Sequence, residues 1–95
     1  MKIEMDCVVT ASKDQLASSV GGETVILGLT TGRYYGVDAV GARIWQLLQS
    51  PMRVDAIRDT IVAEYDVEKE RCETDLLRLL EDMRRSGLVE VQPGS

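Results

Sequence analysis

Histidine and phenylalanine are both absent from this chain of 95 residues, and tyrosine and tryptophan together contribute only four aromatic side chains. Without histidine, the chain lacks the commonest general base and the commonest metal ligand. No apolar run approaches the roughly 18 residues of a transmembrane helix. The N-terminal stretch MKIEMDCVV also lacks the apolar segment of a secretory signal. We therefore expect a cytoplasmic protein with no membrane contact.

Cysteine is also scarce. Cys7 and Cys72 stand 65 positions apart, and neither belongs to a CxxC pair. This spacing indicates neither a zinc site nor a disulfide framework. Free cysteine is among the most buried residue types, so we interpret both as small core residues. No metal and no cofactor is expected.

No combination of residues typical of an active site occurs in the sequence. Serines occur without a GxSxG motif, and the glycines do not form a phosphate loop ending in GK[ST]. Cys7 lies in an apolar stretch with no base to activate its thiol. Carboxylates on the last long helical segment alternate with basic residues, as on a solvated helix face. We expect no catalytic residues and predict that the protein is not an enzyme.

The formal net charge is −5, from 16 acidic and 11 basic residues. Nucleic-acid binding depends on Lys and Arg displacing counterions from phosphates. Between Asp66 and Ser86 the sequence has seven acids and five bases. A helix there would repel a DNA backbone, even though three helices and a trailing strand are the outline of a winged-helix DNA reader. We expect no nucleic-acid partner, whereas a basic peptide remains compatible with this charge.

Apolar runs and turn residues predict several short strands. A first strand is predicted near residues 5–10, and residues 11–22 are predicted to be a connecting loop because they show no sustained period. Two further runs, Thr24–Leu29 and Arg33–Val37, predict a β-hairpin in which Gly32 supplies the turn. The alternating LVEV at residues 88–91 predicts a short terminal strand.

After Val37 the apolar spacing changes from two residues to 3.6, which predicts three helices. The first begins at an N-cap, Asp38, and ends near Ser50 before Pro51. The second carries apolar residues at positions 54, 57, 61 and 65. The third begins after Asp66, spans about 20 residues or ~30 Å, and ends at Gly87. Its predicted buried side consists of Cys72, Leu76, Leu79, Leu80 and Met83.

These elements predict an α+β fold resembling a winged helix-turn-helix. A three-stranded antiparallel sheet is followed by three helices and a possible short terminal strand. We expect one domain over residues 1–95, with residues 92–95 as a frayed tail. At this length the core is modest, and a single site is expected.

The strand RYYGV, residues 33–37, carries no proline or lysine that would protect a sheet edge. Gly36 would let another backbone approach closely, so we predict that an extended peptide adds to this edge as a further strand. A purely structural alternative is that Tyr34 and Tyr35 pack on opposite faces and Gly36 marks a bulge. In the docking interpretation, peptide side chains enter apolar gaps beside the third helix and basic ones meet its acids. The predicted peptide-binding residues are Val25, Leu27, Arg33, Tyr34, Tyr35, Gly36, Val37, Glu68, Cys72, Asp75, Leu76 and Leu79.

Three stretches in order, TGRYYGVDAVGARIWQLL, VDAIRDTIVAEYDVE and DLLRLLEDMRRSGLVE, resemble a known family. The resemblance is to the PqqD-like recognition elements for ribosomally synthesised and post-translationally modified peptides, called RiPPs. More narrowly, the chain is similar to the free-standing leader-binding proteins of lasso-peptide biosynthesis. The similarity covers about residues 23–91. Val37 stands where the family often has Leu, and residues 11–22 match nothing specific.

The resemblance implies a non-catalytic protein that takes up a precursor's leader segment as an antiparallel strand between its third strand and third helix. We expect the chain itself to be a monomer. Carried over to this chain, these are residues 33–37 and 72–79. Leaders of this class resemble Tyr-x-x-Pro-x-Leu. The implied partners are the precursor peptide, a cysteine protease that removes the leader, and an ATP-dependent lasso cyclase. Two alternatives stay open: a PqqD-type role beside a radical enzyme in another RiPP pathway, and a winged-helix DNA-binding regulator.

Overall fold

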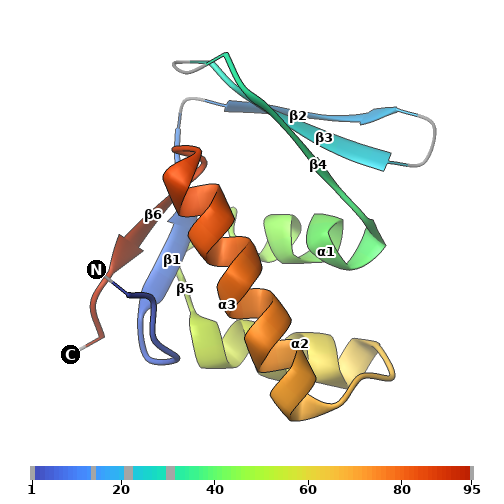
Figure 1. Cartoon of the computed structure of the whole chain (residues 1–95), viewed down its shortest axis with the longest axis vertical. Coiled ribbons are helices and arrows are strands. Elements are labelled where there is room, and N and C mark those ends of the chain that lie inside the picture. Colours follow the sequence, from blue (N-terminus) through green and yellow to red (C-terminus); the bar gives the residue numbers. More distant parts are fainter. Residues whose placement is uncertain (1, 14, 21–22, 30–31, 95) are drawn as a thin grey trace.

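The computed structural model describes residues 2–13, 15–20, 23–29 and 32–94. Within these ranges the chain forms an α+β fold, which confirms the predicted class (Figure 1). Strands and helices follow the order β1 (Val8–Ala11), β2 (Gln15–Val20), β3 (Glu23–Gly28), β4 (Tyr34–Val37), α1 (Ala39–Leu47), β5 (Met52–Arg53), α2 (Val54–Glu64), α3 (Lys69–Arg85) and β6 (Val89–Gln92).

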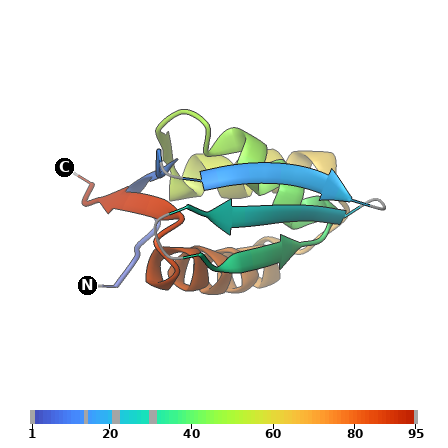
Figure 2. The ribbon, with the colours of Figure 1, turned by 90° about the horizontal axis from the view of Figure 1, so that it is seen from above.

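The strands form two separate antiparallel sheets of three strands each. One sheet has the order β2-β3-β4 and is built from neighbouring segments of the chain. The other has the order β5-β1-β6 and joins segments that are far apart in sequence. Figures 1 and 2 show the β2-β3-β4 sheet lying across one side of the helices, with α3 running along its β4 side.

The predicted loop over residues 11–22 is wrong in its central part. Ala11 belongs to β1, and residues 15–20 form β2, which pairs with β3 from Gln15↔Gly28 to Val20↔Glu23. The outer face of this sheet is open to solvent, so Leu16 on that face is 60% exposed, and no apolar alternation marks the segment. The predicted loop positions 14 and 21–22 lie outside the described residues.

The first predicted strand is also placed differently from the expectation. It begins at Val8 and pairs with β5 and β6 rather than with the hairpin. The third strand of the hairpin's sheet is therefore β2. Gln92, predicted to belong to a frayed tail, pairs with Val8 in β6. The two-residue strand β5 had no sequence signal beyond its position before a helix.

The hairpin itself forms at the predicted place. Gly32 has a φ of 69°, a conformation that glycine adopts readily, and its N–H donates to the Gly28 carbonyl at 2.8 Å. Gly28 donates in turn to the Arg33 carbonyl at 2.9 Å. Threonines 30 and 31 of the predicted TTG turn lie outside the described residues.

Helix α1 begins as the sequence predicts. Asp38 caps it, and its Oδ1 accepts a hydrogen bond from the Gly41 N–H at 2.8 Å. A Cβ atom at Gly41 would lie 2.8 Å from the Cβ of Val37, closer than side chains approach. Gly41 therefore allows α1 to pack tightly against the end of β4.

Helix α3 starts later than predicted. Its N-cap is Glu68, whose side chain makes no capping bond, so the proposed cap at Asp66 is wrong. The end is as expected, because Gly87 has a φ of 73°. Leu88 donates to the Met83 carbonyl at 2.9 Å and Gly87 to Arg84 at 3.1 Å, the paired bonds of a Schellman motif.

The core lies between the two sheets and the three helices. Among the described residues, seventeen apolar side chains are buried there, including Ile26 from β3, Ile44 and Leu48 near α1, and Leu76 and Leu80 from α3. Four of the five residues predicted for the buried side of α3 are buried; the exception, Leu79, is only partly covered. In the described ranges no helix combines the length and apolarity needed to cross a membrane.

Candidate functional site: a groove between β4 and α3

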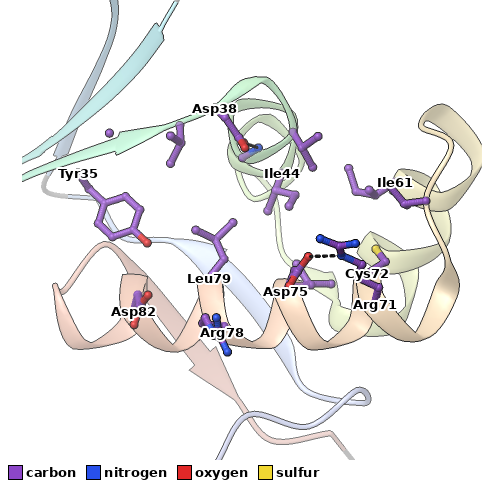
Figure 3. Close-up of a pocket in the computed structure, with 16 residues that line it drawn as sticks. Tyr35, Asp38, Ile44, Ile61, Arg71, Cys72, Asp75, Arg78, Leu79 and Asp82 are labelled. Atoms are coloured by element: carbon purple, nitrogen blue, oxygen red, sulfur yellow. Dashed lines mark hydrogen bonds and ion pairs between the residues drawn. The ribbon is translucent and has the colours of Figure 1, made fainter.

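A groove of about 470 Å³ separates β4 from α3 (Figure 3). Strand β4 forms one wall and α3 the other, while α1 and α2 contribute the floor. The lining residues are Tyr35, Gly36, Val37, Asp38, Val40, Gly41, Ile44, Ile61, Val67, Arg71, Cys72, Asp75, Leu76, Arg78, Leu79 and Asp82.

The wall formed by β4 is an open sheet edge. In the described part of the chain β4 pairs with β3 alone. Arg33 accepts from Gly28, and residues of an antiparallel pair alternate between bonding the neighbour and facing away. The alternation therefore directs the main chain of Tyr35 and Val37 toward β3, and that of Tyr34 and Gly36 toward the open edge.

Gly36 leaves this edge unobstructed. A Cβ atom placed at Gly36 would have nothing within 4 Å, so the glycine is not required by packing within the described structure. Its role at this position is compatible with the close approach of another backbone.

The floor of the groove is apolar. Ile44, Ile61 and Leu76 are buried and contribute their side chains from three different helices. Leu79 and Val67 keep more accessible surface, and Val67 is 39% exposed. Because apolar surface gains free energy when it leaves water, this floor is suited to covering by apolar side chains.

Charged side chains of alternating sign follow one rim of the groove along α3: Arg71, Asp75, Arg78 and Asp82. Arg71 contacts Asp75 at 3.9 Å, and Asp82 contacts Arg85 at 3.8 Å. Both pairs are long and largely exposed, so they hold these side chains weakly. Burial and then the nearby Asp82 charge raise the pKa of Tyr35, whose ring points from β4 toward α3 (Figure 3).

Cys72 lines the groove but is poorly suited to nucleophilic chemistry. Burial, followed by the Asp75 charge, raises the pKa of its thiol, so the thiol stays protonated at neutral pH. Across the described residues, no group of three or more cysteine or carboxylate side chains is arranged to hold a metal ion. The arrangement is one of shape, apolar surface and main-chain hydrogen bonding.

Seven of the twelve residues predicted from the sequence line this groove. They come from its two walls, as predicted, and are Tyr35, Gly36, Val37, Cys72, Asp75, Leu76 and Leu79.

The structure does not bring Val25, Leu27 and Tyr34 to the groove. Leu27 pairs with Tyr34 and Val25 with Gly36, so these three side chains share the outer face of the sheet. The inner face carries Ile26 beside Tyr35. The sequence showed the alternation but not which phase of the strands faces the helices.

Two further predicted residues also lie outside the groove lining. Arg33 precedes β4 and takes part in the hairpin through its carbonyl. Glu68 caps α3, and its carbonyl accepts the Cys72 N–H at 2.9 Å.

Sequence reasoning missed nine lining residues, most of them from α1, α2 and the charged rim: Asp38, Val40, Gly41, Ile44, Ile61, Val67, Arg71, Arg78 and Asp82. The rim had a signal, because positions 71, 75, 78 and 82 follow helical spacing. The floor residues had no such signal in the sequence. An apolar helix face such as that of α1 has the same residue pattern whether it packs in the core or lines a groove.

The fold and groove define an α+β domain of PqqD type. A comparison with protein-family models matches residues 23–89 to the PqqD family, described as coenzyme PQQ synthesis protein D. This match spans most of the chain, from β3 into β6, and the chain belongs to the PqqD family. The resemblance seen in the sequence is thereby confirmed.

Two solved structures are similar to the chain. One, described as TbiB1 in complex with the TbiA(beta) leader peptide, is 40% identical with a TM-score of 0.76, covering 85% of this chain and 94% of that chain. The other, a lasso peptide synthetase B1 complexed with the leader peptide, is 20% identical with a TM-score of 0.67, covering 90% and 98%. At that identity the second match shows the fold alone. No curated protein matched the chain.

Proposed function

We propose that this chain binds the leader segment of a ribosomally synthesised precursor peptide by β-strand addition to β4. The observation that carries the proposal is the open edge of β4 above an apolar groove. The main-chain groups of Tyr34 and Gly36 offer donors and acceptors there, and alternate side chains of an added strand would enter the groove. Similarity to TbiB1, whose structure contains the TbiA(beta) leader peptide, supports this choice of ligand.

The proposed strand has a defined direction. Figure 3 shows Tyr35, early in β4, near Asp82, late in α3, so β4 and α3 run in opposite directions. A peptide antiparallel to β4 would therefore run parallel to α3. Its N-terminal part would lie near Cys72 and its C-terminal part near Asp82.

In this proposal the chain is a carrier and not a catalyst. The leader is held while the segment that follows it stays accessible to separate enzymes. For a lasso precursor these are a cysteine protease that removes the leader and an ATP-dependent cyclase. The raised pKa of the Cys72 thiol is in keeping with a binding role for the groove.

A second candidate is the same peptide-binding role beside a radical enzyme, as the family description of coenzyme PQQ synthesis suggests. It differs in the processing enzyme and not in the groove. A pull-down experiment with this chain as bait separates the two pathways. Retention of the purified protease or cyclase supports the lasso pathway, and retention of the radical enzyme supports the other. DNA binding is disfavoured because α3 carries five acids and five bases, so it has no excess of positive charge to meet phosphates, and because it already forms one wall of the groove.

Fluorescence-polarisation titration tests the proposal directly. The probes are a labelled TbiA(beta) leader peptide and a labelled DNA duplex. We expect saturable binding of leader at micromolar concentrations and none of duplex. Binding of duplex alone, weakening steeply with salt, would instead establish a DNA-binding protein.

A matched pair of substitutions locates the site. Leu79→Asp places a charge in the groove and should weaken leader binding at least about tenfold. Leu16→Asp makes the same change on the outer face of the sheet, where Leu16 is 60% exposed, and should leave binding unchanged. Equal losses in the two variants would reject the groove. Leu76 is a poorer probe because it is 2% exposed and its loss would damage the core.

A further inference from the structure

Arg78 differs from the other arginines of the described chain. Six arginines each form at least one ion pair with a carboxylate: Arg43, Arg53, Arg58, Arg71, Arg84 and Arg85. Arg33 also has an interaction partner. Arg78 alone among the arginines has neither a hydrogen bond nor an ion pair within the described residues, and it lines the groove.

The surroundings of Arg78 give this isolated charge a defined position. It lies between Asp75 and Asp82 along α3 (Figure 3), and it is among the residues that line the groove. Each of these acids contacts a different arginine, Asp75 at 3.9 Å and Asp82 at 3.8 Å. The rim therefore presents one positive charge, that of Arg78, that forms no ion pair within the described residues, between two acids that each have an arginine partner.

The side chains of an added strand that face α3 would each lie near a different charged residue of the rim. Side chains on one face of a strand recur about every 6.7 Å, whereas α3 rises about 1.5 Å per residue, or ~4.5 Å from Asp75 to Arg78 and ~6 Å from Arg78 to Asp82. Successive helix-facing positions of a bound peptide thus lie near different rim charges. Only one of these positions therefore lies opposite Arg78, and a carboxylate there would meet a positive charge that no acid of the described chain pairs.

We propose that Arg78 is a specificity-determining residue that selects a bound peptide carrying an acidic side chain at the one helix-facing position opposite it. The inference rests on the proposed function and adds a feature of the ligand that the apolar floor does not define. The planar guanidinium, with its fork of donors, matches a carboxylate better than an ammonium would.

The expected size of the effect is modest because Arg78 is exposed to water. An exposed ion pair changes affinity by about two- to fivefold and weakens as salt is added. Such a preference is sufficient to rank related leaders without being required for binding.

A glutamate scan of the labelled TbiA(beta) leader tests the proposal. Each residue of the leader is replaced in turn by Glu, Gln or Lys, and affinities are measured by fluorescence polarisation at low and high salt. We expect one position at which Glu binds about two- to fivefold tighter than Gln. Arg78→Gln should abolish that preference, and Arg78→Glu should reverse it in favour of Lys.

Arg53→Glu is the control variant, because it changes the net charge equally but lies in β5, outside the groove. It should keep the preference of the native chain. The inference is overturned if no position shows a preference that Arg78→Glu reverses, or if Arg53→Glu reverses it equally. If the unsubstituted leader does not bind the native chain at all, the proposed function is contradicted, and the inference fails with it.

Discussion

The two sheets described in this molecule have three strands each but are built differently. The β5-β1-β6 sheet joins residues 8–11, 52–53 and 89–92, so it ties together distant parts of the chain. Its central strand is bonded further to the helical half, because Ala11 donates to the Leu48 carbonyl at 2.7 Å and Ser12 to Leu88 at 2.9 Å. Val9 in β1 is fully buried.

The β2-β3-β4 sheet is formed by one stretch of chain, residues 15–37. Only its inner face packs on the helices, through side chains such as Ile26, while Leu16 and Tyr34 on the outer face are 60% and 74% exposed. The β5-β1-β6 sheet therefore stabilises the fold, and we call it the fastening sheet. The β2-β3-β4 sheet leaves the outer edge of β4 open, and we call this edge the presenting edge. Changes in the first should alter stability, and changes at the β4 edge should alter binding.

Val9→Asp gives the largest expected effect. It places an unpaired carboxylate at a fully buried position in the fastening sheet. The penalty for such a charge is several kcal/mol, a large part of the roughly 5–15 kcal/mol that holds a domain together. We expect loss of the folded state by circular dichroism. A cooperative thermal transition like that of the native chain would show that the two sheets do not differ in this way.

Gly36→Pro tests the presenting edge and should have the next largest effect. Proline removes the Gly36 N–H, which faces away from β3, and its ring obstructs an approaching backbone. We expect at least a tenfold loss of leader affinity, or about 1.4 kcal/mol or more, in a protein that remains folded. Gly36→Ala keeps the donor and should bind nearly normally, since a Cβ there meets nothing within 4 Å. Equal affinities of the two variants would argue against strand addition.

Acidification should produce a smaller effect, a decrease in the free energy of unfolding. Glu81 accepts hydrogen bonds from Arg84 at 2.8 Å and from the Ile3 N–H at 3.3 Å. The bond from Arg84, with the Ile3 N–H assisting, lowers the pKa of Glu81 below its ordinary value of 4.5. The bond from Arg53 similarly lowers the pKa of Asp55.

Because these carboxyl groups ionise more readily in the folded state, their contribution is complete above pH 4.5 and is lost as the pH falls through the lowered pKa values. Both side chains are partly exposed, so water screens these interactions and the change should be small. Urea unfolding midpoints between neutral pH and pH 3 measure it, with Glu81→Gln expected to flatten part of the decline. A midpoint that rises on acidification would contradict this account.

The sequence predicted those parts of the fold that local chemistry specifies. Asp38 as a helix cap, Gly32 as a turn and Gly87 as a helix end all appear where expected, because each depends on a few neighbouring residues. The pairing of β1 with β6 spans almost the whole chain and left no local signal. The strand β2 was missed because an edge strand with an exposed face needs little apolar alternation.

The site was predictable in outline for the same reason. The unprotected β4 edge and the phase of Cys72, Leu76 and Leu79 on α3 are local features, and both form walls of the groove. Which face of the hairpin meets the helices is decided by tertiary packing, so Val25 and Leu27 were placed on the wrong side.

Amide hydrogen exchange of β4 with and without leader peptide tests the central claim most directly. In the absence of peptide, Tyr35 and Val37 should be protected by β3, while Tyr34 and Gly36 exchange quickly. On saturation with leader, Tyr34 and Gly36 should become protected, and the amides of β2 should not change. If Tyr34 and Gly36 still exchange quickly when the leader is bound, or if β2 gains the protection instead, strand addition at β4 is contradicted.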